Sequence, residues 1–167
     1  MTAYEKLTAG DIMTRALLCA RPDQALMEAE SMLIERRIGG APVVEAGRLV
    51  GVISRSDIAR VEVLMLSLDG QVSDQLQWKV QADGFEHSQG PEFAGFRERL
   101  GKLKVRDAMH REVITCHPDT PVAEVAATMV RQHMHRLIVV VQERPVGIVS
   151  SLDIVKLVAQ VDEKQAN

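Results

Sequence analysis

Aromatic residues, basic charge and long apolar runs are all scarce in this chain of 167 residues. Aromatic side chains make up 3% of it, which argues against the stacking platforms that bind single-stranded nucleic acid. The net charge is −3, so no overall basic balance indicates DNA or RNA binding. No apolar run is long enough to cross a bilayer. We therefore expect neither a nucleic acid nor a membrane among the partners.

Cysteine is nearly absent too, since only Cys19 and Cys116 occur and no Cys-x-x-Cys pair is present. Both lie in apolar stretches that we expect to form buried strands, which favours packing over redox chemistry. The first residues lack the basic start and apolar core of a signal peptide. Unpaired thiols without an export signal predict a reducing, cytoplasmic setting.

Motifs of several enzyme classes are missing as well. The chain has no Gly-x-Ser-x-Gly, no His-Glu-x-x-His, no P-loop and no dinucleotide-binding fingerprint, and we expect it not to be an enzyme. Four histidines lie close in sequence, but a metal site needs further fixed ligands, and we predict none. These four are His110, His117, His133 and His135.

The chain does contain an internal duplication with an offset of 96 residues. Residues 11–58 align without a gap to residues 107–154, and 14 of these 48 positions are identical. The duplication is clearest where Gly51-Val52-Ile53-Ser54-Arg55-Ser56-Asp57-Ile58 matches Gly147-Ile148-Val149-Ser150-Ser151-Leu152-Asp153-Ile154. Each half is too small to bury much core alone, so we expect the two to pack about a pseudo-twofold axis.

Each half predicts the element order β-α-β-β-α. In the first half, residues 17–20 read as a strand and residues 25–37 as a helix that Gly39-Gly40 ends. Two strands follow around a tight turn at Ala46-Gly47, and a helix begins at Arg55. In the second half we expect strands at 113–116, 137–141 and 146–149, a turn at Glu143-Arg144, and a helix over 151–161.

The predicted domains are a first repeat over 8–68, an insertion over 69–102 and a second repeat over 103–161. We expect helices near 72–80 and 93–103 in the insertion, with a loop between them. The insertion is either a surface excursion or a contact for an oligomer or a partner. The apolar and aromatic residues of the insertion favour a contact with an oligomer or a partner. They are Leu76, Trp78, Phe85, Phe93 and Phe96.

The repeated Ser-x-x-Asp suits the start of a helix that directly follows a strand. The serine oxygen can accept from a free backbone N–H, and the acid three residues later can accept from the serine amide. Such a start also offers free N–H groups and the positive end of a helix dipole, which suits a phosphate. The residues therefore predict either a cap that only stabilises the helix or a cap that also binds a ligand.

A tandem β-α-β-β-α unit that ends in Gly-h-h-Ser/Thr-x-x-Asp, with h apolar, resembles the CBS domain pair, or Bateman module. The resemblance implies an α+β fold in which two repeats stack and form two clefts between them. In that family the clefts often bind AMP, ADP, ATP or S-adenosylmethionine. The motif acid typically accepts hydrogen bonds from the ribose hydroxyls, and the motif serine typically contacts a phosphate.

These two roles carry over by position onto the acids and serines of the two motif copies. In that family the start of the second strand typically lines the base pocket, which maps to residues 38–42 and 134–138. The residues implied for the first cleft are Ile38, Gly39, Pro42, Ser54, Arg55 and Asp57. The residues implied for the second cleft are Ile114, Met134, His135, Arg136, Ser150 and Asp153. Arg55 is either a phosphate contact or a solvated residue, whereas Arg136 either closes its pocket or pairs with a phosphate. We therefore expect the two clefts to differ.

The resemblance implies a non-catalytic regulatory module that binds an adenosine nucleotide as a regulatory ligand, needs no other cofactor, and signals by a conformational change. The sequence shows no fused catalytic, channel or DNA-binding domain, so we expect it to act on a partner protein in trans. Modules of this family commonly pair, and we expect a homodimer. The alternative is a ligand-free assembly subunit whose clefts are vestigial.

Overall fold

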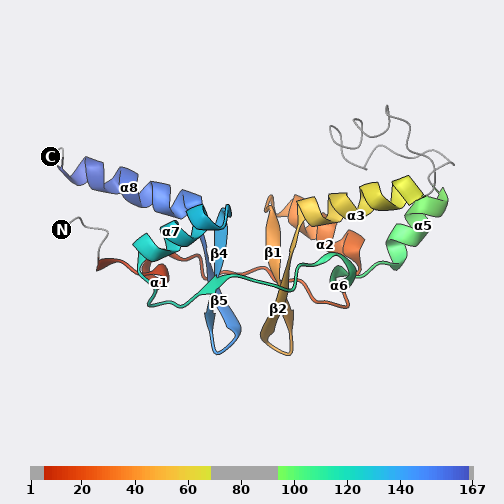
Figure 1. Cartoon of the computed structure of the whole chain (residues 1–167), viewed down its shortest axis with the longest axis horizontal. Coiled ribbons are helices and arrows are strands. Elements are labelled where there is room, and N and C mark those ends of the chain that lie inside the picture. The colour runs from red at the N-terminus through yellow and green to blue at the C-terminus, as the bar shows by residue number, and fades with distance from the viewer. Residues whose placement is uncertain (1–5, 69–93, 166–167) are drawn as a thin grey trace. The chain divides into compact units, whose positions relative to one another are not determined.

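The structure is a computed structural model that describes residues 6–68 and 94–165 (Figure 1). Its helices are α1 (Ala9–Ile12), α2 (Leu26–Glu35), α3 (Arg55–Leu68), α5 (Ala94–Lys102), α6 (Val105–Ala108), α7 (Val122–Arg131) and α8 (Ser151–Gln165). Its strands are β1 (Gly40–Glu45), β2 (Arg48–Ser54), β3 (Thr115–Cys116), β4 (Arg136–Val141) and β5 (Arg144–Ser150). The predicted α+β class is thereby confirmed.

The chain forms two compact units that combine segments from distant parts of the sequence. Unit 1 contains residues 1–19, 44–50 and 112–167, and unit 2 contains residues 20–43 and 51–111. Each unit therefore joins the helices of one repeat to the short helix that opens the other repeat. Helix α1, which opens the first repeat, packs on β5, whereas α6, which opens the second repeat, packs on α2 and α3.

In unit 1 a three-stranded sheet, in the order β3-β4-β5, supports the helices (Figure 1). Strand β3 runs parallel to β4, with Thr115 opposite Ile138, and β5 runs antiparallel to β4, with Leu137 opposite Val149. Alternate strand residues and one face of α7 share a core, as period-2 and period-3.6 patterns require. The core residues are Ala9, Val125, Met129, Leu137, Val139 and Val149.

In unit 2 the helices α3, α5 and α6 each pack on α2, and α3 also packs on α5 and α6. Its buried apolar residues are Ala20, Leu26, Ala29, Leu33, Ala41, Val43, Ile53, Ile58, Leu100 and Val105. The strand predicted over 17–20 is wrong, because this segment forms only one bridge, between Ala20 and Val43. Cys19 lies in this irregular segment and is exposed, whereas Cys116 in β3 is half-buried.

Left-handed residues end α2 and α7, and the predicted stop at Gly39-Gly40 is wrong. Arg37 and His133 each have a φ of 52°. The amide of Ile38 donates to the carbonyl of Leu33 at 3.0 Å, and the amide of Arg37 donates to that of Ile34 at 3.0 Å. This pair of bonds is a Schellman motif, which normally places glycine at the left-handed position.

The two hairpin turns also depend on left-handed residues. Ala46 and Gly47 have φ values of 49° and 79°, which confirms the first predicted turn. Gln142 and Glu143 have φ values of 49° and 64°, so the second turn lies one residue before its predicted place. Two positive φ values in a two-residue loop match the twist of an antiparallel hairpin.

Helix α3 buries a carboxyl group that the apolar pattern did not predict. Glu62 is 3% exposed, and its Oε1 has no hydrogen-bond partner among the described residues. Burial, with a smaller contribution from the negative charge of Glu30, raises the pKa of Glu62 to about 8. Leu64 on the same helix is 58% exposed, although it is apolar.

The predicted helix near 72–80 lies outside the described residues, as do four residues of the insertion considered for a contact: Leu76, Trp78, Phe85 and Phe93. The side chain of Phe96 lies outside them as well. Helix α5 occupies most of the second helical stretch predicted there, and its Leu100 is buried.

Candidate ligand site at two strand–helix junctions

Both motif copies form the same junction, in which a strand passes directly into a helix. In unit 2, Oδ2 of Asp57 accepts from the amide of Ser54 at 3.0 Å and from its hydroxyl at 2.5 Å. The amide of Asp57 donates back to Oγ of Ser54 at 3.3 Å. In unit 1, Ser150 and Asp153 repeat these contacts at 2.8, 2.6 and 3.4 Å. The predicted helix cap is confirmed in both copies.

The start of the preceding hairpin strand lies against each junction. The amide of Arg55 donates to the carbonyl of Gly39 at 3.1 Å, and that of Ser151 donates to the carbonyl of His135 at 2.9 Å. Gly40 allows the close approach in unit 2, because a Cβ there would lie 2.8 Å from the carbonyl oxygen of Ile53. The backbone thus places Gly39, and its counterpart His135, beside the helix start.

Strand pairing adds a further residue to the unit 1 junction. Arg136 is the residue opposite Ser150 in the β4–β5 pair, and both Arg136 and His135 are exposed. The backbone thus brings two basic residues, His135 and Arg136, next to the helix start that carries Asp153. The unit 2 counterpart of Arg136 is Gly40, so the two junctions differ in shape and charge, as the sequence predicted.

The Schellman motifs position two further predicted residues. Ile38 and Met134 are the residues whose amides donate back to Leu33 and Met129, both at 3.0 Å. This geometry turns the chain from the helix into the strand that leads to the junction. Both side chains are half-buried, and Met134 packs against the core of unit 1.

Pro42 and Ile114 are farther from this arrangement. Pro42 is buried, and its carbonyl accepts from the amide of Ala20 at 2.9 Å. Ile114 precedes β3 and is 37% exposed. Among the described residues, neither makes a hydrogen bond to Ser54, Ser150 or either motif acid. Their predicted ligand contacts are therefore the least supported of the twelve.

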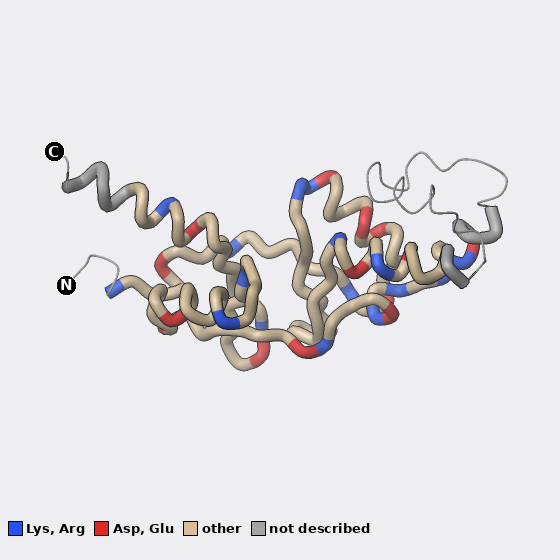
Figure 2. Tube along the Cα trace, turned by 45° about the horizontal axis from the view of Figure 1, so that its top comes forward, with Lys and Arg blue, Asp and Glu red and all other residues tan. Residues whose placement is uncertain are grey.

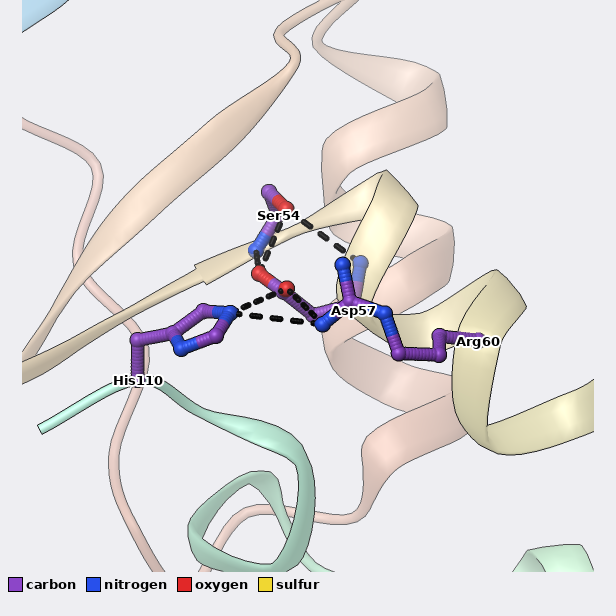
Figure 3. A network of polar contacts seen from close by, with 4 residues as sticks. All are labelled: Ser54, Asp57, Arg60 and His110. Atoms are coloured by element: carbon purple, nitrogen blue, oxygen red, sulfur yellow. Dashed lines mark hydrogen bonds and ion pairs between the residues drawn. The ribbon is translucent and has the colours of Figure 1, made fainter. Parts of the chain in front are cut away.

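A contact that sequence reasoning missed joins His110 to the unit 2 junction (Figure 3). Nε2 of His110 lies 2.8 Å from Oδ1 of Asp57, and Nη1 of Arg60 lies 3.5 Å from the same oxygen. An ionised carboxylate only accepts hydrogen bonds, so Nε2 must carry a hydrogen. Nη1 of Arg60 also lies 3.5 Å from Nε2 of His110, but these two atoms are both donors and do not bond to each other. Both point toward Oδ1 of Asp57, which is their common acceptor.

The local backbone explains why His110 arrives there. His110 and Val52 exchange two hydrogen bonds of 2.9 Å between their amides and carbonyls, which holds the segment between α6 and β3 against β2. In unit 1, Thr14 and Ile148 make the same exchange at 2.9 and 3.0 Å. The repeat offset places Thr14 at the position of His110, so the alignment of the two repeats did show that only the second copy has a histidine here. It did not show which residue this histidine contacts, because 53 residues separate His110 from Asp57.

The rest of the described chain adds no second chemical centre. Across residues 6–68 and 94–165, no group of three or more His, Cys, Asp or Glu is arranged to hold a metal ion. No helix within these ranges combines the length and apolarity needed to cross a membrane. Basic and acidic residues alternate along the described trace without a long run of either sign (Figure 2).

Comparison with known proteins identifies the family of both repeats. The family model described as "CBS domain" matches residues 9–63 and 105–160, which together are more than half of the chain. A relative from Methanocaldococcus jannaschii, the uncharacterized protein MJ1426, is 32% identical over 153 residues, with 87% of this chain and 88% of that protein covered. Another protein of that organism, MJ1232, is 26% identical, but the chain spans only 42% of its length.

Two solved structures are similar in fold and in sequence. The CBS domain of a CBS domain-containing membrane protein from Sphaerobacter thermophilus is 31% identical, with a TM-score of 0.69 and coverage of 93% of this chain and 90% of that one. The CBS domain pair of protein MJ0100, solved with 5′-methylthioadenosine and S-adenosyl-L-methionine, is 28% identical, with a TM-score of 0.63 and coverage of 91% and 99%. With a family match at both repeats, the chain belongs to the CBS domain family and carries a tandem pair of these domains.

Proposed function

We propose that the chain is a non-catalytic regulatory module that binds an adenosine compound at its Ser-x-x-Asp junctions and reports it by a conformational change. The observation that carries this proposal is that the same capped junction is built twice, by residues 96 positions apart. In unit 1 the cap uses only Oδ2 of Asp153. Among the contacts of the described residues, Oδ1 of Asp153 has no partner and is available to a ligand.

The junction chemistry fits the parts of an adenosine nucleotide. A carboxylate oxygen accepts from the neighbouring hydroxyls of a ribose, and charge makes such bonds strong. The first amides of α3 and α8 and the positive end of each helix dipole suit a phosphate. Exposed basic side chains adjoin both junctions, namely Arg55 in unit 2 and His135 and Arg136 in unit 1. Ile38 and Met134 supply apolar surface for a base.

The ligand class is proposed as AMP, ADP, ATP or S-adenosylmethionine. The pair from MJ0100 was solved with two adenosine compounds, one of them S-adenosyl-L-methionine, and this supports the adenosine part. The division into repeats over 8–68 and 103–161, separated by residues 69–102, belongs to the same proposal. So do a cytoplasmic setting, a homodimer and a protein partner that responds to the ligand.

Titration calorimetry and thermal unfolding with AMP, ADP, ATP, 5′-methylthioadenosine and S-adenosylmethionine test this function. A ligand at 100 times its dissociation constant should stabilise the fold by about 2.7 kcal/mol. Asp57→Ala and Asp153→Ala should each abolish binding at one junction. Asp107→Ala is the matched control, because the Asp107 carboxylate caps α6 through the amide of Lys104 at 2.8 Å and lies at neither junction. No stabilisation by any of these compounds would refute the proposal.

The second candidate function is a ligand-free assembly subunit, and one surface favours it. Among the residues of α7 and α8 whose side chains are described, four large apolar ones are exposed: Val130 at 75%, Leu152 at 57%, Val155 at 60% and Val158 at 45%. Exposed apolar clusters mark association surfaces. Sedimentation of Val155→Glu tests this candidate, with Leu64→Glu in α3 as the control because Leu64 is 58% exposed on unit 2. Dissociation by the first change alone would support assembly through α7 and α8.

A further inference from the structure

We propose that His110 is a built-in competitor for the ligand of the unit 2 junction. Its imidazole donates to Oδ1 of Asp57, the oxygen that a ribose hydroxyl would otherwise use. An adenosine compound can then bind in unit 2 only by displacing the ring, whereas the unit 1 junction binds without this step. The proposal rests on the proposed function and adds that the two sites differ in affinity because of one residue.

The hydrogen-bond inventory of Asp57 supports competition. Oδ2 already accepts from both the amide and the hydroxyl of Ser54. Oδ1 accepts from His110 at 2.8 Å, with Arg60 more distant at 3.5 Å. Two adjacent ribose hydroxyls need at least one carboxylate oxygen with free lone pairs. The ring therefore holds the position that the diol requires.

The second junction shows what the site is like without the ring. Thr14 takes the place of His110, with the same backbone exchange, but its side chain makes no hydrogen bond to Asp153 among the described contacts. Accordingly, Asp57 is only 5% exposed and counts as buried, whereas Asp153 is half-buried. The cap geometry is shared, so the difference in access comes from the neighbouring segment.

The ring can leave without disturbing the fold. The side chain of His110 is 56% exposed, and that of Arg60 is 67% exposed. The backbone of His110 is held by its two bonds to Val52, so rotation of the side chain alone frees Oδ1. His110 also lies two residues before Glu112, where the chain passes from unit 2 into unit 1. Displacement of the ring therefore occurs on the segment that joins the units.

Calorimetry with 5′-methylthioadenosine tests the proposal, because this probe has the ribose diol and no phosphate. In an Asp153→Ala background, which leaves only the unit 2 site, His110→Thr should raise the affinity at least about tenfold, which corresponds to about 1.4 kcal/mol. The reciprocal change Thr14→His in an Asp57→Ala background should weaken the unit 1 site. His117→Thr, an exposed histidine outside both junctions, is the control and should change neither affinity.

Unchanged or weaker binding by His110→Thr would overturn the proposal while leaving the proposed function intact. Absence of binding by the wild type and by both variants would refute the proposed function and the proposal together. Imidazole NMR of the wild-type chain gives an independent readout. The ring of His110 should carry its hydrogen on Nε2 in the free protein, and its resonances should shift on saturation with the probe. No shift at saturation of both sites would equally contradict displacement.

Discussion

The backbone carbonyl of His110 lies so close over Gly51 that a Cβ on Gly51 would be 2.7 Å from its oxygen. The first motif glycine is therefore required by the segment that crosses it. Gly51→Ala should lower the free energy of unfolding by about 1–3 kcal/mol, because backbone has to move to relieve the overlap. Urea denaturation measures this change.

Gly147 provides a graded comparison, since a Cβ there would meet the side chain of Met13 rather than backbone. Because Met13 can change rotamer, Gly147→Ala should destabilise less than Gly51→Ala. Gly101 in α5 has no neighbour among the described residues within 4 Å of such a Cβ, so Gly101→Ala should stabilise by about 0.5–1 kcal/mol. Equal effects at all three glycines would contradict the assigned contacts.

The two cap carboxylates should differ in their contribution to stability. Asp153→Ala removes a helix cap, which costs about 1 kcal/mol. Asp57→Ala removes the same cap together with the bond to His110, so it should cost about 1 kcal/mol more. A double-mutant cycle with His110→Thr measures the added part. If the two aspartate variants unfold at the same denaturant concentration, the contact between Asp57 and His110 contributes nothing in solution.

Stability should depend on pH through Glu62. Its pKa of about 8 in the folded chain exceeds the ordinary value of 4.5, so above about pH 5 the folded state holds a proton that the unfolded state has lost. The free energy of unfolding should therefore fall as pH rises from about 5 to about 8, by up to a few kcal/mol at about 1.36 kcal/mol per pKa unit, and then level off.

Glu62→Gln is neutral at every pH and should remove most of this slope. Glu28→Gln, an exposed acid in the first turn of α2, is the control and should keep the slope. Thermal unfolding between pH 5 and 9 compares the variants. A slope that survives in Glu62→Gln would assign the pH dependence to other groups.

Glycine should improve the ends of α2 and α7. Arg37 and His133 have positive φ values, a conformation that costs an ordinary residue roughly 1 kcal/mol and costs glycine little. Arg37→Gly and His133→Gly should each raise the free energy of unfolding by about 0.5–1 kcal/mol. Replacement by a β-branched residue, such as Arg37→Val, should lower it. Circular dichroism during denaturation measures both directions.

Local chemistry in the sequence was enough to predict the junctions. Ser54 and Asp57 are three residues apart, and so are Ser150 and Asp153, and capping depends only on that spacing and on the strand before it. The Ala46-Gly47 turn was predictable for the same reason. The end of α2 was not predictable in this way. Glycine is the residue expected in the left-handed conformation that ends a helix, so the stop was predicted at Gly39-Gly40, whereas Arg37 adopts that conformation.

Features that depend on contacts between distant parts of the chain could not be predicted from the sequence. The bond between His110 and Asp57 requires the segment between α6 and β3 to pair with β2. Glu62 is buried on α3, which packs on α2, α5 and α6, so its burial follows from the packing of the helices rather than from its own polarity. Residues 17–20 resemble a strand, yet only Ala20 finds a pairing partner.

The assignment of residues 1–19 and 112–167 to one compact body has a consequence for biosynthesis. Ala9 cannot join Val125 and Leu137 until those later residues have also been synthesised. Closing so large a loop is slow, because its entropy is lost before the contacts form. An isolated N-terminal half would lack β5, on which its helix α1 packs, and would also lack the segment of His110 that lies over Gly51. Such a truncated product should therefore be a good substrate for cellular proteases.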